Sequence, residues 1–174
     1  MLLRRVGTLA ALTFLCSGCS LILDFDKPPV DAAPDSPVND TSCMAFEPND
    51  SPAAAMAITP GDYTAAICGG GESDYFKITV TGTEGVLARI DFANRNGAGD
   101  LDLRLLNGDG GQVRDESRTS ADREEVMCPG GLTCNSPLAA GDYLLHVLPF
   151  NAAVQSEYML HFEFTTVAVD AGVD

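Results

Sequence analysis

The sequence predicts an all-β domain, an antiparallel β-sandwich, over residues 43–166. Three observations support this fold class: short segments alternate apolar and polar residues, turn-forming residues separate them, and no segment carries a sustained apolar stripe at helical spacing. A period of two with one apolar face is the pattern of a half-buried strand, and short strands separated in this way are typical of sandwiches.

Four segments show the alternation most clearly. Apolar residues occupy every second position in each, so one face of the strand is expected to be buried. Turn-forming clusters lie between such segments at 81–85, 94–99, 107–111 and 140–142. The expected core residues are Phe76, Ile78 and Val80; Val86, Ala88, Ile90 and Phe92; Leu101, Leu103 and Leu105; and Tyr158, Leu160, Phe162 and Phe164.

The first 18 residues have the layout of a bacterial signal peptide. Arg4 and Arg5 precede an apolar run over 6–15, and Ser17-Gly18-Cys19 follows at once. The run is shorter than the roughly 20 residues that a membrane-spanning helix needs. Small residues before a cysteine resemble the lipobox of bacterial lipoproteins, so we expect cleavage before Cys19 and lipidation of its thiol. The alternative is ordinary cleavage nearby, which gives a soluble secreted protein.

Residues 19–42 are expected to form a disordered tether. This stretch is rich in proline and aspartate and has little apolar content. Such a composition buries too little surface to offset the entropy of ordering. The tail over 167–174 is expected to be loose as well, which leaves 43–166 as one domain of ordinary size.

The charge of the chain limits its partners. The formal net charge is −15 at pH 7. A surface of this sign repels nucleic-acid phosphates and anionic lipid headgroups, so we expect no nucleic-acid partner and membrane contact through the lipid anchor only. The acidity serves solubility or, alternatively, includes a site for a divalent cation.

Four cysteines lie within the expected domain: Cys43, Cys68, Cys128 and Cys134. An even number in an exported domain favours two disulfides. Of the three possible pairings we expect Cys128–Cys134, which closes a short Pro-Gly-Gly turn, and therefore Cys43–Cys68. A zinc site is the alternative, but the sequence has no CxxC pair to support one.

Several motifs in a fixed order resemble the bacterial pre-peptidase C-terminal domain. They are Glu47-Pro48-Asn49-Asp50, the segments 74–80 and 100–106 with the turn that follows the latter, and the closing segments 140–147 and 158–160. The resemblance covers about 120 residues. It implies a small jelly-roll-like sandwich that has no catalytic activity of its own.

The resemblance also implies a calcium site where the leading acidic segment meets the sandwich. Carried over by motif, the ligands are Glu47, Asn49 and Asp50 from that segment and Asp74 from the start of a strand. Calcium prefers six to eight hard oxygen ligands, which carboxylates and an amide carbonyl supply. The alternative is a structural turn whose side chains accept hydrogen bonds from local backbone amides.

Other candidate groups are expected to be structural. His146 and His161 fall on strands at positions that point away from the main apolar face. Asp100 and Asp102 are neighbours on one strand, where we expect a solvated face and not two carboxylates facing each other across a cleft. The acids between 115 and 125 are expected to form a solvated strand edge. No nucleophile elbow or metalloprotease motif is present.

The sequence therefore predicts a non-catalytic lipoprotein of the outer membrane or cell surface, or alternatively a periplasmic or secreted soluble protein. We expect a monomer that binds a protein or polysaccharide and acts without a peptidase on the same chain. Exposed aromatic residues would carry such binding, with Tyr75, Tyr143 and Phe150 as candidates. The alternatives are an assembly accessory of a separately encoded exported protease and, less favoured, an uncharacterised hydrolase.

Overall fold

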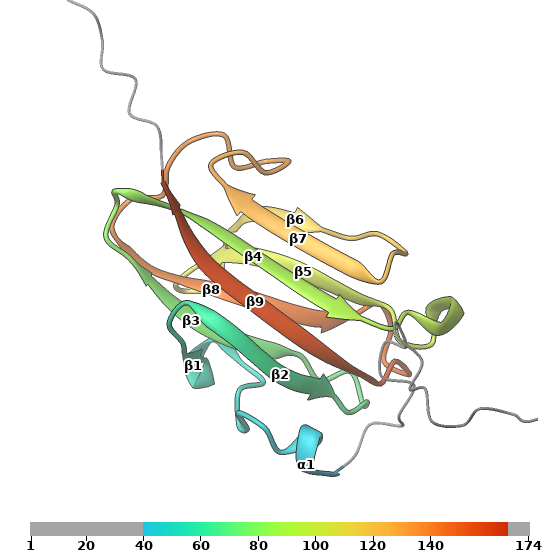
Figure 1. Cartoon of the computed structure of the whole chain (residues 1–174). Coiled ribbons are helices and arrows are strands. Elements are labelled where there is room, and N and C mark those ends of the chain that lie inside the picture. The colour runs from blue at the N-terminus through green and yellow to red at the C-terminus, as the bar shows by residue number, and fades with distance from the viewer. Residues whose placement is uncertain (1–39, 167–174) are drawn as a thin grey trace, which may run out of the picture. The chain divides into compact units, whose positions relative to one another are not determined.

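A computed structural model describes residues 40–166, which fold into two facing β-sheets (Figure 1). The five-stranded sheet has the order β1 (Met56–Ala57), β3 (Asp74–Val80), β8 (Gly141–Pro149), β5 (Leu101–Asn107), β6 (Val113–Ser117). The four-stranded sheet has the order β2 (Gly61–Ile67), β9 (Ser156–Thr166), β4 (Glu84–Phe92), β7 (Arg123–Cys128). The predicted all-β sandwich is thereby confirmed.

Neighbouring strands are antiparallel, with one exception among the described strands. The two-residue strand β1 runs parallel to β3, with Met56 opposite Phe76. Three short helical turns complete the described part: α1 (Asp40–Cys43), η1 (Pro52–Ala54) and η2 (Arg95–Gly97). The turn α1 includes the last three residues of the expected tether. The expected signal peptide, Cys19, the rest of the tether and the tail at 167–174 lie outside the described residues.

The inner faces of the two sheets form the core, as the alternation predicted. Every second residue of β3, β4, β5 and β9 points inward, and all the expected core residues are buried except Phe164, which packs partly buried against the others. Burying a large apolar side chain contributes roughly 1.5–3 kcal/mol, so this layer is the main source of stability. No helix among residues 40–166 is long and apolar enough to span a bilayer.

Strands β1, β2, β6 and β7 were not anticipated from the sequence. The inward positions of β2 include Ala65, which is too small to make a strong apolar signal. On β7 the inward positions are Glu124, Val126 and Cys128, so a charged residue interrupts the expected pattern. The period of two is present in both strands, but side-chain size and charge conceal it.

The expectation of a solvated acidic edge at 115–125 is wrong for two residues, Asp115 and Glu124, which are 1% and 0% exposed. The Asp115 carboxylate accepts hydrogen bonds from the backbone amides of Met127 and Thr133, each at 3.0 Å. Glu124 accepts from the Thr119 amide at 2.9 Å and from the hydroxyls of Thr119 and Ser117. Both acids therefore accept hydrogen bonds from backbone amides and hydroxyls that are not paired with a neighbouring strand.

Asp100 and Asp102 do not lie on a solvated face either. They are 7% and 3% exposed. The side-chain nitrogen of Asn94 donates to Asp100 Oδ1 at 3.1 Å, and Arg118 Nε lies 3.2 Å from Asp102 Oδ2. These polar partners permit the burial of two carboxylates at the end of β5.

Both predicted disulfides are present. Cys43–Cys68 joins α1 to the residue after β2, with the two Cα atoms 5.7 Å apart. Cys128–Cys134 closes the turn that follows β7, with the Cα atoms 5.1 Å apart. Cys43–Cys68 closes the longer of the two loops, with a sequence separation of 25. On the chain-entropy model, a loop of this length contributes about 3.5 kcal/mol to the free energy of unfolding. The bridge also ties the leading segment to the sandwich.

Replacing Asp115 by alanine tests the role of the buried acids. The change removes the acceptor of the backbone amides of Met127, which is partly buried, and Thr133, which is exposed, so we expect the free energy of unfolding to fall by about 1–3 kcal/mol. Chemical denaturation of the oxidised protein measures this loss. The matched control is Glu125→Ala, because Glu125 is exposed on the same sheet and its replacement is expected to change stability by less than about 0.5 kcal/mol. Equal losses in the two variants would contradict the assignment.

Candidate functional site

The leading segment before η1 packs against the start of β3 and brings three of the four predicted ligands together. The backbone amide of Tyr75 donates to the Asn49 carbonyl at 2.9 Å, which fixes the segment beside the strand. The Asn49 amide donates in turn to Glu47 Oε2 at 3.1 Å. Asn49 is fully buried and Asp74 is 1% exposed.

The side-chain amide of Asn49 lies between two carboxylates. One of its two terminal atoms is 3.1 Å from Asp74 Oδ1 and 3.2 Å from Glu47 Oε1. When the nitrogen occupies that position, it donates a hydrogen bond to both acids. When the oxygen occupies it, three oxygens converge, which requires a cation to offset their repulsion. The orientation of this amide therefore depends on what lies between the carboxylates.

Tyr158 completes the site from the opposite sheet. Its hydroxyl donates to Asp74 Oδ2 in a buried hydrogen bond that joins β9 of one sheet to β3 of the other. Burial raises the pKa of Asp74 to about 7, the hydrogen bond from Tyr158 opposes this rise, and the nearby carboxylates Glu47, Glu72 and Asp50 add to it. Burial, followed by the charge and hydrogen bond of Asp74, also raises the pKa of Tyr158 well above its ordinary value.

Glu47 has a related but smaller perturbation. Burial, and then the charges of Asp50 and Glu72, raise its pKa, whereas the hydrogen bond from the Asn49 amide opposes the rise. The site thus concentrates negative charge in a region with limited access to water. A proton or a cation relieves the repulsion, and the protein's own groups do so only in part.

The fourth predicted ligand, Asp50, is not brought into this hydrogen-bonded cluster. Its side chain is exposed, and it acts on Asp74 and Glu47 only through its charge. Sequence reasoning missed Tyr158 as a partner of Asp74, because a strand residue in an apolar run gave no sign that its hydroxyl would meet an acid. Glu72, whose carboxylate accepts from the Cys68 amide, is a further acid beside the cluster.

Within residues 40–166, no three side chains drawn from histidine, cysteine, aspartate and glutamate converge closely enough to hold a metal by themselves. The convergent set is two carboxylates, from Glu47 and Asp74, together with the Asn49 amide. An amide oxygen and carboxylates are hard ligands of the kind that Ca²⁺ takes, so the donor chemistry fits this ion.

The two histidines lie on outer faces, as the alternation predicted. The His146 ring stacks on Tyr75, with ring centroids 4.0 Å apart. His161 Nδ1 lies 2.6 Å from Asp62 Oδ1, and its Nε2 lies 3.7 Å from Glu163 Oε2. Both ring nitrogens of His161 therefore face carboxylates.

The three aromatic residues singled out as binding candidates have different environments. Tyr143 is 9% exposed, belongs to the core and donates its hydroxyl to the Ala139 carbonyl at 3.0 Å. Tyr75 is half-buried under the stacked imidazole. Phe150 is 63% exposed at the end of β8, so it alone of the three presents its ring to solvent.

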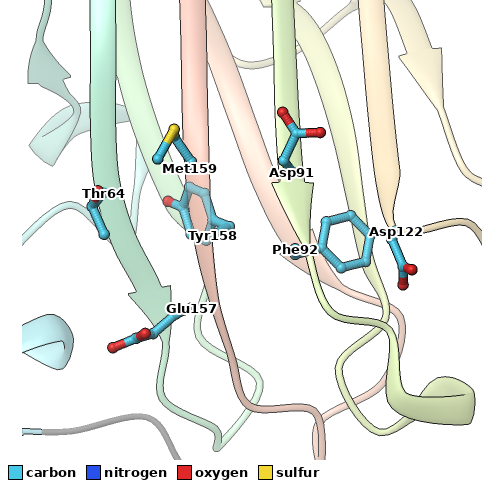
Figure 2. Close-up of a pocket in the computed structure, with 7 residues that line it drawn as sticks. All are labelled: Thr64, Asp91, Phe92, Asp122, Glu157, Tyr158 and Met159. Atoms are coloured by element: carbon cyan, nitrogen blue, oxygen red, sulfur yellow. The ribbon is translucent and has the colours of Figure 1, made fainter. Parts of the chain in front are cut away.

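A cavity of about 310 Å³ opens at one end of the four-stranded sheet (Figure 2). Thr64, Met159 and Asp91 are cross-strand neighbours there on β2, β9 and β4. Asp91 is paired with Arg89 and Arg123. The acids of this cavity are engaged in contacts within the chain, and the cavity shows no open acid–base pair among its described lining residues. The remaining lining residues in Figure 2 are Phe92, Asp122, Glu157 and Tyr158.

The fold and the site define a β-sandwich domain with two disulfides and a buried acidic cluster where its leading segment meets the sheets. No family model matches the chain, and no curated protein matches it.

Among solved structures, the chain is similar to the pre-peptidase C-terminal domain of a collagenase from Bacillus anthracis. The match has 15% identity and a TM-score of 0.49, and it covers 63% of this chain and 94% of that one. It is also similar to PliG from Aeromonas hydrophila, a periplasmic inhibitor of g-type lysozyme, with 12% identity, a TM-score of 0.43, and 64% and 96% coverage of the two chains.

A third similarity is to the Yersinia pseudotuberculosis-derived mitogen, with 20% identity, a TM-score of 0.38, and coverage of 66% of this chain and 89% of that one. These distant similarities assign neither a ligand nor an activity to the chain.

The raised pKa of Asp74 predicts how stability depends on pH in the absence of metal. The unfolded chain releases this proton near the ordinary value of 3.8, and the folded chain releases it at about 7. The stabilising contribution is therefore complete below about pH 4 and is lost as the pH rises through 7.

Denaturation in EDTA at pH 5 and pH 8 tests this dependence. We expect the wild type to lose about 1–3 kcal/mol more stability over this interval than Asp74→Asn, which has no carboxyl proton to release. Asp109→Asn, an exposed acid in the β5–β6 turn, is the control and is expected to follow the wild type. Identical pH dependence in wild type and Asp74→Asn would show that Asp74 is not protonated in the folded state.

Proposed function

We propose that this chain is an exported, non-catalytic binding module of the pre-peptidase C-terminal type, held at the cell envelope by a lipid on Cys19. One observation carries the non-catalytic part of the proposal: the most deeply buried acids serve the domain's own donors. Asp74 accepts from Tyr158, Asp115 from two backbone amides, and Glu124 from hydroxyls and an amide. Acids engaged in this way stabilise the fold through hydrogen bonds and do not form an acid–base pair.

Export is supported by the two disulfides. Cys43–Cys68 and Cys128–Cys134 both join residues of the described domain, and structural disulfides persist in oxidising compartments outside the cytosol. The basic and apolar head of the sequence, followed by Ser17-Gly18-Cys19, supplies the export signal and the proposed lipidation site. The outer membrane or the cell surface is the proposed location.

Calcium is proposed as a structural ion of the acidic cluster. Glu47, Asn49 and Asp74 would supply oxygens directly, and Asp50 would supply a further carboxylate from the exposed side. The ion would stabilise the ionised form of Asp74 and favour the orientation in which the Asn49 oxygen faces the acids. Its role is to fasten the leading segment to β3, next to the Cys43–Cys68 bridge.

The proposed partner is a protein or a polysaccharide of the envelope or its surroundings. The net charge of −15 disfavours nucleic acid and other polyanions. The exposed ring of Phe150 supports a binding role for the end of the sandwich at which it lies. The module is proposed to act as a monomer.

Thermal melting in EDTA and in millimolar calcium tests the ion site. With calcium at about 100 times its dissociation constant, the folded state gains about 2.7 kcal/mol, and the melting temperature of a domain of this size rises by several degrees. We expect this rise in the oxidised wild type and its loss in Asp74→Asn and Asp50→Ala. Asp109→Ala is the control and is expected to keep the rise. The same melting temperature in EDTA and calcium would contradict the site.

Replacing Cys19 by serine tests the anchor. Metabolic labelling with a fatty acid, followed by fractionation of a bacterial host, measures lipidation and membrane association. We expect the wild type to carry label and to sediment with membranes, and Cys19→Ser to carry none. Cys16→Ser, which changes the neighbouring cysteine of the signal, is the control and is expected to keep the label. An unlabelled, soluble exported wild type would establish secretion without an anchor.

A further inference from the structure

Two hollows lie at one end of the five-stranded sheet, on either side of the residues that end β8. The first has a volume of about 450 Å³ and the second about 320 Å³. Cavities of this size accommodate small ligands when a few polar groups converge on them. The first is lined by Asp100, Asp102, Arg118, Thr119, Ser120 and Phe150. The lining of the second includes Ser73, His146, Leu148 and Asn151.

The hollows share the outer face of the sheet. Asp102 of the first pairs across the strands with Leu148 of the second, and Arg104 pairs with His146 in the next outward row. The inward neighbours on these strands belong to the core, so the paired residues project to the same outer side. Phe150 follows Leu148 by two residues and stands at the rim of the first hollow.

The first hollow offers hydrogen-bond acceptors and a donor to a ligand. One oxygen of Asp100 receives a bond from Asn94, and one oxygen of Asp102 faces Arg118. Within residues 40–166, the other oxygen of each carboxylate has no hydrogen-bond donor, although both side chains are more than nine-tenths buried. Arg118 is half exposed and keeps further N–H groups for a ligand.

The second hollow is lined by a histidine that has a polar atom unpartnered within residues 40–166. His146 is 8% exposed, and its Nε2 atom is buried without a hydrogen-bond partner in the described part of the chain. Burial, followed by the charge of Arg104, lowers the pKa of His146 to about 4, so the imidazole is neutral near pH 7. A buried polar group that is left unmatched costs free energy, which a ligand hydroxyl that reached Nε2 would offset.

The chemistry of this surface distinguishes between classes of ligand. Asp100, Asp102 and the nearby Glu124 outnumber Arg118, so an anionic ligand is repelled. Arg118 pairs with Asp102, and the second hollow presents a neutral imidazole, so the surface offers a basic peptide less free negative charge than its acids alone would. The groups suit a neutral ligand that has many hydroxyls and an apolar ring face to pack against Phe150, and oligosaccharides combine these properties.

We propose that the two hollows form a binding site for a short neutral glycan, with Phe150 packed against a sugar ring, Asp100 and Asp102 accepting bonds from its hydroxyls, and His146 contacting a neighbouring sugar. This inference rests on the proposed binding function and names its ligand class and place. The site lies on the outer face of β5 and β8, whereas the acidic cluster is formed around Asp74 between the leading segment and the sheets.

Titration calorimetry with neutral oligosaccharides of three to six sugars from the cello, manno, xylo, malto and chito series tests the site. The protein is the oxidised chain from Ser20 onward, and a lysine decapeptide is the comparison ligand. We expect one series to bind, Phe150→Ala and Asp100→Asn each to weaken that binding by about tenfold or more, and the His146 imidazole resonances to shift when the sugar is added. Leu132→Ala, which alters another exposed apolar residue in the turn after β7, is the control and is expected to bind as the wild type does.

Three results would overturn the glycan site. They are the absence of binding by every series, binding of the lysine peptide in place of a sugar, and equal weakening in Leu132→Ala. Since the fatty-acid labelling measures the anchor independently, a lipidated protein that binds no sugar would refute the glycan site and leave the anchoring proposal intact. A sugar-binding protein that carries no lipid would do the reverse.

Discussion

The hydrogen bond between Tyr158 and Asp74 is the interaction on which the arrangement of the domain depends. It joins β9 of one sheet to β3 of the other inside the sandwich, and Asp74 also meets Asn49 of the leading segment. Apolar burial holds two sheets together without fixing where a preceding segment docks. Tyr158 holds Asp74 in place, and Asn49 then fixes the segment beside it, because a displaced segment would leave the buried Asn49 without its contacts to Asp74 and Tyr75.

The same interaction makes the site sensitive to protons and cations. Burial and neighbouring acids raise the free energy of an ionised Asp74, so a proton on that carboxyl or a positive ion beside it stabilises the folded domain. The Cys43–Cys68 bridge keeps the leading segment near β3 in either state. A calcium ion would therefore change charge and rigidity at this junction while leaving the two-sheet core as it is.

The sequence was sufficient to predict the sandwich, the inward residues of β3, β4, β5 and β9, and both disulfides, because apolar alternation and cysteine number report directly on burial and export. It did not reveal the inward acids Asp115 and Glu124, since their burial depends on donors contributed by distant loops. The sequence did not reveal the pairing of Tyr158 with Asp74 for the same reason. The two residues are 84 positions apart, and they meet only because the two sheets pack face to face.

The proposed glycan site on the outer face of β5 and β8 shows the same limit of local sequence information. Asp100 and Asp102 read as solvated neighbours, yet contacts with Asn94 and Arg118 bury them. The position of the leading segment depends on the state of Asp74, and the carboxyl resonance of Asp74 measured against pH, with and without calcium, tests this dependence most directly. We predict an apparent pKa of about 7 in EDTA and a value well below that in calcium. An ordinary pKa in EDTA that calcium does not change would contradict the account.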